Sequence, residues 1–385
     1  MQSAILVSVL SAMELLRRNS IPVLHVKGTY YDVGYDIGRT FASLIQTYLE
    51  INSTLNKIYI PAYNTERGRK IYEETLFVVG NKYPHYLREL EGTADGAGVP
   101  FYKLFLLHLD DIILPPEGCT NVGQGCSTVI VNQKNQKIIG HTEDGLKEAL
   151  NLCYVVNVHI TESSPHEIFT AFCYPGLLPG YSMGFNSYFA FTINIMVVKN
   201  PPAGRIPRTF LTRELFAADS VVRAEEVLKC YGGGVADAFS VNLMTLKNNV
   251  DDCLLYNFEV SPKNLPSNSS IVEKKKIDIG EHFFHCNKFL RIKGIEEISN
   301  VLKTSNDRHE TEKQLPKAED LNSVINILSH SSAPSTCCNI FRDRSSESVI
   351  TLATAIFNRA TRTWSIYMDN PALTEPNLIL PMKFS

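Results

Sequence analysis

The strongest constraint on the fold is a change of pattern at Pro115-Pro116. Residues 21–28 predict one strand, and from there to about residue 115 apolar residues recur at the spacing of amphipathic helices. Between residues 126 and 200 the chain instead consists of short, β-type apolar runs that are separated by polar turns. Helices therefore dominate the first third and antiparallel strands follow, which predicts a layered α+β fold.

The rest of the chain continues the alternation of strands and helices. Two helices are predicted at about 207–217 and 221–230, and a third at 320–330, before two closing strands. The polar segment 303–320 is predicted to be a surface loop. Neither an internal repeat nor a linker is evident in the sequence, so one domain is predicted.

The composition is that of an ordinary globular chain. Of the 385 residues, 44% are hydrophobic and 20% are charged, and the net charge of −3 disfavours nucleic acid as a partner. The apolar run Ala4–Met13 has no Lys or Arg before it and is followed at once by Glu14 and Arg17, which favours a short amphipathic helix or a loose tail over a signal peptide. No other run is long and apolar enough to span a bilayer, so a cytoplasmic protein without a membrane span is predicted.

The nine cysteines predict neither a disulfide framework nor a metal site. Their count is odd, their spacings are irregular and no Cys-x-x-Cys pair occurs, so structural zinc is not expected and the cytosol is the default compartment. Cys153 and Cys173 lie within apolar runs, which predicts that they are buried as small hydrophobic residues.

Two Gly-Cys pairs lie close together and differ in the residues that come after them. Cys119 is followed by a polar, glycine-containing loop, whereas Cys126 begins the strand-like run CSTVIV. A nucleophile at the first residue of a strand is held in a defined position by the sheet, so Cys126 is the better candidate. The alternative at this point is that both are unreactive loop or core thiols.

The runs CSTVIV and KIIGHTED flank the polar turn NQKNQK and predict a β-hairpin. Such a hairpin returns Asp144, eighteen residues beyond Cys126, to the start of its first strand. His141 is the alternative partner for the thiol, but in an extended strand it faces the opposite side from Asp144. Because the carboxylate also lies nearer the open end of the hairpin, Asp144 is preferred.

Several motifs in order along the chain carry a family resemblance. They are GTYYDVGYDIGR (28–39), ELEGTADGAGVP (89–100), GCST with GHTEDG, HCNKFL (285–290), and TLATAIFN with IYMDNP. Together they resemble the acyltransferase and amidohydrolase branch of the N-terminal nucleophile hydrolases, which includes the acyl-CoA:6-aminopenicillanic acid acyltransferases. The resemblance implies a four-layer αββα sandwich with a helical N-terminal segment, and neither a metal nor a cofactor.

The resemblance also implies that the chain cuts itself at the Gly125–Cys126 bond. An α chain of residues 1–125 and a β chain of residues 126–385 would then form one domain together. Glycine before the scissile bond suits the strained backbone of such a cut, because it carries no Cβ. The free α-amine of Cys126 would serve as the base, since an α-amine has a pKa of about 7.7–8.0 in model peptides.

The remaining site residues follow from the same resemblance. Asp144 matches the aspartate that orients the new amine, and Asn287 matches an asparagine of the oxyanion hole. Asn194 falls near another family asparagine and is a possible second oxyanion donor. The alternatives are a strand-end residue for Asn194 and a helix cap before residues 288–297 for Asn287.

The sequence departs from the family pattern in two places. The aspartate stands in Thr142-Glu143-Asp144-Gly145, so Glu143 adds a carboxylate that could bind a substrate ammonium, with a solvated hairpin residue as the alternative. The late arginine of the family, which stands in a Ser-x-Cys-Arg setting, has no clean counterpart. Asn339 falls near that position, and Arg342 and Arg344 are its neighbours.

The resemblance favours a cysteine amidohydrolase with a small-molecule N-acyl amine as its substrate. The residues in these motifs are most similar to those of members that hydrolyse β-alanyl conjugates of biogenic amines, such as those of dopamine or histamine. Acyl transfer from an acyl-CoA or N-acyl donor on the same fold is one alternative. A chain that never cleaves and acts as a binding module is another.

Overall fold

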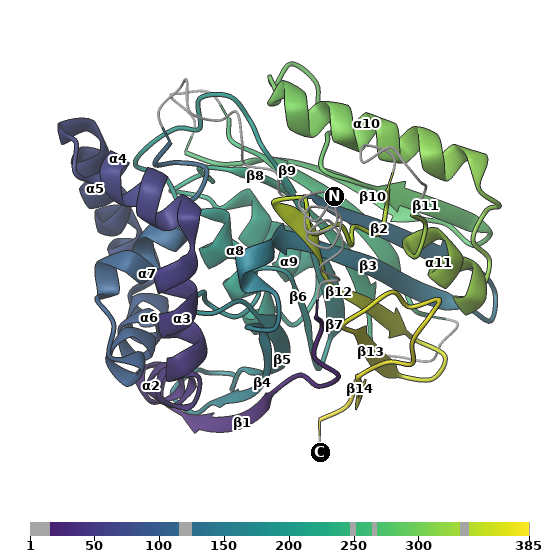
Figure 1. Cartoon of the computed structure of the whole chain (residues 1–385), viewed down its shortest axis with the longest axis horizontal. Helices are drawn as coiled ribbons and strands as arrows, with labels where there is room; N and C mark the ends of the chain where they lie inside the picture. Colours follow the sequence, from purple (N-terminus) through teal and green to yellow (C-terminus); the bar gives the residue numbers. More distant parts are fainter. Residues whose placement is uncertain (1–15, 115–124, 247–251, 264–267, 332–338, 385) are drawn as a thin grey trace, which may run out of the picture.

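Two β-sheets lie against each other between two layers of helices (Figure 1). The computed structural model describes residues 16–114, 125–246, 252–263, 268–331 and 339–384. The apolar run Ala4–Met13, the tail residues before Gly125 and Cys119 itself lie outside the described residues. The predicted α+β class and the four-layer order are confirmed, while the division into chains 1–125 and 126–385 stays a prediction.

The first layer holds the helices of the N-terminal third. They follow strand β1, Val23–Gly28, which agrees with the predicted strand at 21–28. The helices are α2 Tyr30–Thr40, α3 Ala42–Ile51, the π-helix Leu55–Tyr59, α4 Ile60–Tyr63, α5 Glu66–Lys82, α6 Pro84–Ala97 and α7 Phe101–Leu107.

The sheet next to this layer has eight strands in the order β1-β4-β5-β6-β7-β8-β9-β10. Only its edge strand β1 pairs in parallel, with β4, and the other pairs are antiparallel. The further strands are β4 Tyr154–Ile160, β5 Ile168–Cys173, β6 Met183–Asn186, β7 Phe189–Met196, β8 Ala238–Thr245, β9 Leu255–Ser261 and β10 Ile271–Ile277.

The second sheet is antiparallel, with six strands in the order β11-β2-β3-β12-β13-β14. Its centre is the predicted hairpin, which the structure confirms. The strands are β2 Gly125–Asn132, β3 Lys137–Leu146, β11 Glu281–His285, β12 Val349–Asn358, β13 Thr363–Tyr367 and β14 Leu378–Pro381.

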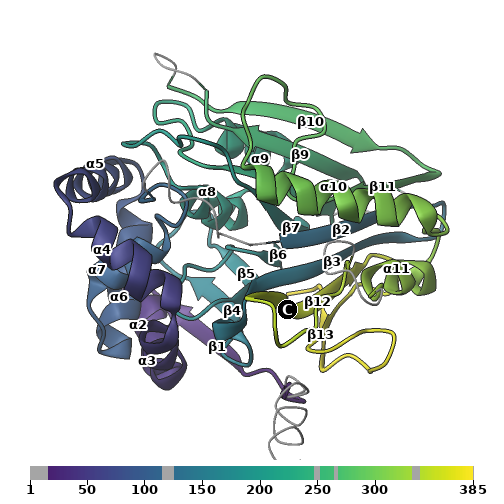
Figure 2. The same ribbon diagram turned by 45° about the horizontal axis from the view of Figure 1, so that its top comes forward.

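Four later helices of the described ranges complete the layers. Helices α8, Arg208–Glu214, and α9, Val221–Lys229, join the N-terminal layer and agree with the two predicted helices. Helices α10, Ser299–Gln314, and α11, Leu321–Leu328, cover the outer face of the six-stranded sheet (Figure 2). Short 3-10 turns occur at Lys147–Ala149 and Leu215–Ala217. Within the described ranges, none of the helices is both long and apolar enough to cross a membrane.

The prediction of a surface loop at 303–320 is wrong, because α10 occupies most of that segment. Its buried face consists of Val301, Ser305, Arg308, His309 and Thr311, which recur at helical spacing. Four of these five residues are polar or charged, so an apolar periodicity does not reveal the helix.

Helices α2 and α6 pack backbone against backbone through glycines. A Cβ built at Gly34 would lie 1.9 Å from the carbonyl oxygen of Glu89, and one at Gly92 would lie 2.2 Å from that of Tyr31. Gly38 and Gly96 are equally crowded. These four glycines belong to the two motifs 28–39 and 89–100, so the motifs encode a close helix crossing.

We expect Gly92→Ala to lower the free energy of unfolding by about 1–3 kcal/mol, because overpacking against a fixed backbone outweighs the better helix propensity of alanine. Gly80→Ala in α5 is the matched control, since its Cβ would meet only Leu87 Cδ1 at an ordinary 3.5 Å. The free energy of unfolding of this control should rise by up to about 1 kcal/mol. Urea unfolding of both variants checks this, and equal shifts would contradict the close crossing.

Candidate active site

The register of the hairpin places the candidate residues. Gly125 pairs with Asp144, and Cys126 pairs with Glu143. Because side chains alternate along a strand, Cys126 and Glu143 project from one face of the sheet while Asp144 projects from the other. The predicted approach of Asp144 to the start of the first strand is thus observed, although its side chain lies on the face opposite to the thiol.

On the inner face, the thiol of Cys126 meets a carboxylate that is held from several sides. Cys126 Sγ lies 3.9 Å from Glu143 Oε2, within the limits of a weak sulfur hydrogen bond. Tyr174 Oη donates to Glu143 Oε1 at 2.6 Å, Ser182 Oγ donates to Glu143 Oε2, and His141 Nε2 lies 3.0 Å from the same oxygen. Glu143 is therefore buried and fixed, which excludes the alternative of a solvated hairpin residue.

Burial raises the pKa of the Cys126 thiol well above its usual range, and the Glu143 and Asp144 carboxylates raise it further. The thiol is therefore protonated at neutral pH in the uncleaved chain. His141 contacts Glu143 and lies 2.8 Å through Nδ1 from Thr128 Oγ1, so both of its ring nitrogens are engaged and it supports the carboxylate. These contacts do not favour its alternative role as the direct partner of the thiol.

The backbone nitrogen of Cys126 has its own partner. Its N–H donates to Asn287 Oδ1 at 2.8 Å, and Asn287 Nδ2 donates to the carbonyl oxygen of Ile195 on β7 at 2.7 Å. Asn287 thus turns its oxygen toward the backbone nitrogen of Cys126 and uses an N–H group elsewhere. Because residues 288–297 form no helix, the helix-cap alternative is excluded. Its oxyanion role stays a prediction.

On the outer face, Asp144 is held by β12 and by an arginine. Thr351 Oγ1 donates to Asp144 Oδ1 at 2.6 Å, and Arg342 Nε lies 3.7 Å from Asp144 Oδ2. Burial raises the pKa of Asp144, while the charges of Arg342 and Arg308 act in the opposite direction. Arg342, which the sequence left as a mere neighbour of the expected arginine position, therefore belongs to the site.

Arg308 of α10 is the site residue that the sequence did not reveal. Its Nη1 donates to the carbonyl oxygen of Cys126 at 2.7 Å and to Ser127 Oγ at 2.9 Å, and its Nη2 donates to Asn287 Oδ1 at 2.8 Å. The side chain is fully buried. Nothing in the polar sequence of α10 distinguishes this arginine from the exposed charges around it.

Asn194 lies on β7, across the interface between the sheets. Its Oδ1 accepts hydrogen bonds from Thr128 Oγ1 at 2.9 Å and from Asn242 Nδ2 at 2.7 Å. Its Nδ2 is buried and has no hydrogen-bond partner among the described residues. A buried amide donor without a partner is costly, so this N–H is a candidate donor for a ligand. Asn194 lies in the last third of β7, so the alternative of a strand-end residue stays open. Its role as an oxyanion donor stays a prediction.

The remaining described cysteines are buried and free: Cys153, Cys173, Cys230, Cys253 and Cys286. This confirms the prediction that Cys153 and Cys173 are buried. Burial raises the pKa of both thiols above the usual cysteine value. Cys337 and Cys338, like Cys119, lie outside the described residues.

A second buried charge cluster lies on the N-terminal side of the site. The guanidinium of Arg208 contacts Asp110 at 2.7 Å, Asp111 at 3.5 Å, and Asp237. Burial and the neighbouring Asp110 raise the pKa of Asp111 well above its usual range, and burial raises the pKa of Asp237 to about 6. One cation thus faces three carboxylates.

Two groups in the described part of the chain bring three potential metal-ligand atoms within 4.8 Å of one another. The first is Cys126 with His141 and Glu143, and the second is Asp110 with Asp111 and Asp237. In the first, Tyr174 and Ser182 already bind the carboxylate, and in the second, Arg208 supplies the positive charge. That the protein needs no metal or cofactor stays a prediction.

Comparison with known proteins finds a matching sequence family, a similar curated protein and a similar solved structure. The family described as acyl-coenzyme A:6-aminopenicillanic acid acyl-transferase matches residues 131–373, a range that begins just after Cys126 and contains Asp144, Asn287 and Arg308. A Drosophila melanogaster protein named beta-alanyl-dopamine/carcinine hydrolase is 41% identical over 386 residues, which cover 96% of this chain and 98% of that protein. A solved structure of a mutant conjugated bile acid hydrolase from Clostridium perfringens covers 68% of this chain and 97% of its own, with 11% identity and a TM-score of 0.38.

We expect Asp111→Asn to stabilise the protein, by roughly 1–3 kcal/mol at pH 8. Because the pKa of Asp111 is raised in the folded state, the wild type loses stability as the pH rises above the ordinary aspartate value of about 3.9. The gain in melting temperature should therefore be larger at pH 8 than at pH 5. The exposed Asp219→Asn is the control and should change little at either pH. A loss of stability at both pH values would show that the Asp111 charge is needed by Arg208.

Proposed function

The chain belongs to the acyl-coenzyme A:6-aminopenicillanic acid acyl-transferase family, and we propose that it is a cysteine amidohydrolase that cleaves β-alanyl conjugates of biogenic amines. The observation that carries the proposal is the pairing of Cys126 with Glu143, beside Asn287 and Arg308, at the start of a central strand. The name of the Drosophila relative supports β-alanyl-dopamine and carcinine as members of the substrate class.

The proposed reaction begins with maturation of the chain. Cys126 Sγ attacks the carbonyl carbon of Gly125, and its proton has Glu143 as the nearest acceptor. The Gly125–Cys126 C–N bond breaks, the nitrogen takes up a proton, and a thioester to Gly125 remains. Water then hydrolyses the thioester, which leaves the carboxylate of Gly125, the thiol and a free α-amine. The products are an α chain of residues 1–125 and a β chain of residues 126–385.

Cleavage converts an amide nitrogen that cannot act as a base into an amine that can. Asn287 Oδ1 already contacts this nitrogen at 2.8 Å, which supports a role in orienting the amine. Asp144 lies one strand away, beside Gly125, and Arg342 and Thr351 fix its carboxylate. The negative charge of Asp144 would favour the protonated amine that forms when the base accepts the proton of the thiol.

Hydrolysis of the substrate repeats the chemistry on an external amide. The thiolate adds to the amide carbonyl, the protonated leaving amine departs, and a thioester of β-alanine remains on Cys126. Water, activated by the α-amine, releases β-alanine and restores the thiol. The unpartnered Nδ2 of Asn194 supports it as a donor to the oxyanion, and a released N–H of Asn287 would be the second.

Hydrolysis and acyl transfer differ only in whether water or an amine accepts the acyl group. The description of the family names an acyl transfer, which keeps transfer as the second candidate. A cytoplasmic location is part of the proposal and is supported by the six described cysteines, all of which are free.

We expect the purified wild-type protein to separate into two fragments on a denaturing gel, with Cys126 as the new N-terminus by sequencing. Cys126→Ala should remain one chain and release no amine, because both steps need the thiol. Cys119→Ala is the matched control, and it should cleave its own chain and release amine as the wild type does. A wild-type chain that stays whole on prolonged incubation would support a binding module instead, and a chain that stays whole only in Cys119→Ala would assign the nucleophile to the other cysteine.

We expect Arg308→Met to slow self-cleavage and to lower kcat/KM by about 10- to 100-fold, because charge-assisted hydrogen bonds to Cys126 and Asn287 are lost. Lys303→Met on the exposed face of the same helix is the control. The half-time of cleavage is measured together with the melting temperature. If Arg308→Met lowers the melting temperature but cleaves its own chain at the normal rate, the role of the arginine is structural.

A further inference from the structure

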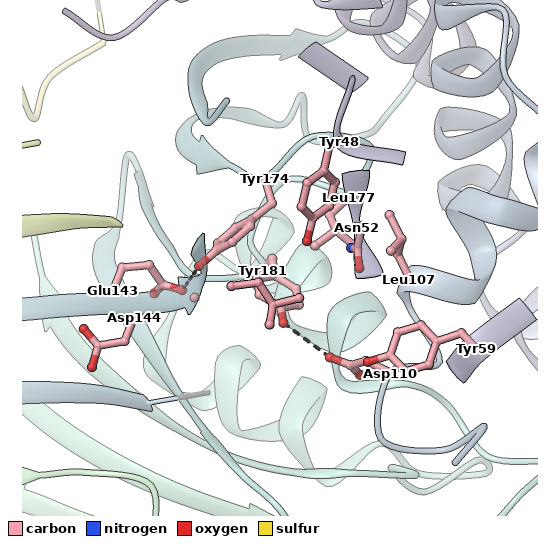
Figure 3. A pocket seen from close by; sticks show the side chains of 12 residues that line it. Tyr48, Asn52, Tyr59, Leu107, Asp110, Glu143, Asp144, Tyr174, Leu177 and Tyr181 are labelled. Atoms are coloured by element: carbon pink, nitrogen blue, oxygen red, sulfur yellow. Dashed lines mark hydrogen bonds between the residues drawn. The ribbon is translucent and has the colours of Figure 1, made fainter. Parts of the chain in front are cut away.

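A buried cavity extends from β3, the hairpin partner of the strand that carries Cys126, into the N-terminal helical layer (Figure 3). It begins at Glu143 and Gly145 on β3 and ends at Asp110, beyond the C-terminal end of α7. Tyr48, Tyr59, Tyr174 and Tyr181 line it between these ends. Cys126 itself does not line the cavity, but Glu143 does, and Glu143 Oε2 lies 3.9 Å from the thiol sulfur. The cavity therefore reaches the carboxylate next to the nucleophile.

The charge of the wall points to a cationic occupant. Among the described residues, three acidic residues, Glu143, Asp144 and Asp110, line the cavity, and no lysine, arginine or histidine does. Figure 3 shows the carboxylate of Asp144 pointing away on the far side of the strand, so Glu143 and Asp110 are the two that face this space. Tyrosine rings offer the negative faces that attract an ammonium group. Asp110 is already paired with Arg208, whereas the described partners of Glu143 are the hydroxyls of Tyr174 and Ser182 and the ring of His141. Glu143 is therefore the wall carboxylate that has neither an arginine nor a lysine among its described partners.

The distances limit how long the occupant is. Glu143 Oε2 lies 3.9 Å from Cys126 Sγ. In a three-carbon acyl group with a terminal ammonium, that nitrogen lies about 4 Å from the carbonyl carbon when extended. A three-carbon acyl group on the thiol can therefore place its ammonium beside Glu143. A much longer acyl group would carry the ammonium past this carboxylate.

Gly145 shapes the entrance of this cavity. A Cβ at this position would lie 2.5 Å from Tyr174 Oη and 2.7 Å from Leu352 Cδ1. The absence of a side chain lets the Tyr174 hydroxyl reach Glu143 Oε1. The rings of Tyr174 and Tyr181 then meet edge to face at 5.1 Å, and Tyr181 Oη reaches Asp110 Oδ2 at 3.3 Å.

We infer that this cavity is the acyl-group pocket and that it selects a short acyl group with a terminal ammonium. Glu143 is the ion partner of the ammonium and Tyr174 presents its ring to it. Asp110 and Tyr181, which both contact Arg208, form the far wall. The inference rests on the proposed function, since it presupposes that Cys126 carries the acyl group. It adds the residues that would decide which acyl groups are accepted.

The test compares amides of one amine that differ only in the acyl group. Butanoyl replaces the ammonium of β-alanyl by a methyl group of similar size, and succinyl replaces it by a carboxylate. We expect the kcat/KM of the wild type for the β-alanyl amide to exceed that for the butanoyl amide by about 100-fold or more, in line with the loss of a charged hydrogen-bond partner. The succinyl amide should react more slowly still.

Variants assign the preference to the wall of the cavity. Glu143→Gln should reduce the ratio of the β-alanyl to the butanoyl kcat/KM at least tenfold, whatever its effect on either rate alone. Asp110→Asn should reduce the same ratio by a smaller factor. Glu73→Gln, an exposed carboxylate on α5, is the control and should keep the wild-type ratio. The ratio is used because a loss of folding or of thiol reactivity lowers both rates alike.

The outcomes separate the inference from the proposed function. If no amide is hydrolysed, or if hydrolysis persists in Cys126→Ala, the proposed function fails. If hydrolysis depends on Cys126 but the wild type cleaves the butanoyl amide as fast as the β-alanyl amide, only the inference is overturned. A wild-type ratio near one overturns the inference even where a variant does not fold, and an active Glu143→Gln that keeps the wild-type ratio overturns the assignment to this cavity.

Discussion

The pairing of β2 with β3 is the interaction on which the site depends. It sets Cys126 opposite Glu143 and Gly125 opposite Asp144, so one register places a carboxylate on each face of the sheet at the same point. A slip by one residue would exchange the two faces and leave the thiol without its neighbour. The central position of both strands in the six-stranded sheet, with β11 and β12 on either side, fixes that register. The register shift of β12 between Thr351 and Ala353 lies where β12 passes Asp144 and Glu143, and irregular pairing of this kind is common beside functional sites.

The charges around the hairpin are buried, and the surrounding layers are built to hold them. Asp144 needs Arg342 and Thr351 from the end of the chain, while Cys126 and Asn287 need Arg308 from α10. Glu143 needs Tyr174 and Ser182, which belong to the region of the eight-stranded sheet. Buried ions are expensive to desolvate and stabilise little by themselves. Their arrangement therefore makes more sense as preorganisation of a site than as a contribution to stability.

Local patterns in the sequence predicted the parts of this site that lie close together along the chain. The strand after Cys126, the polar turn and the return to Asp144 follow from apolar runs and turn residues, and the α+β layering follows from the change at Pro115-Pro116. The contacts that come from distant segments could not be predicted in the same way. Arg308 sits on a helix whose buried face is mostly polar, and Arg342 reaches Asp144 only because β12 pairs with β3. Both depend on tertiary packing, for which local hydropathy gives no signal.

The environment of Cys126 differs in kind before and after the proposed cut. In the intact chain its nitrogen is an amide donor to Asn287, and burial together with two carboxylates keeps the thiol protonated. These same carboxylates become favourable once the nitrogen is an amine, because a protonated amine beside the thiol would offset their charge and lower the pKa of the sulfur. The acidic setting that keeps the thiol protonated in the intact chain would therefore support an ammonium and thiolate pair after the proposed cut. In the intact chain, by contrast, the thiol depends on Glu143 as the acceptor of its proton, as the proposed self-cleavage requires.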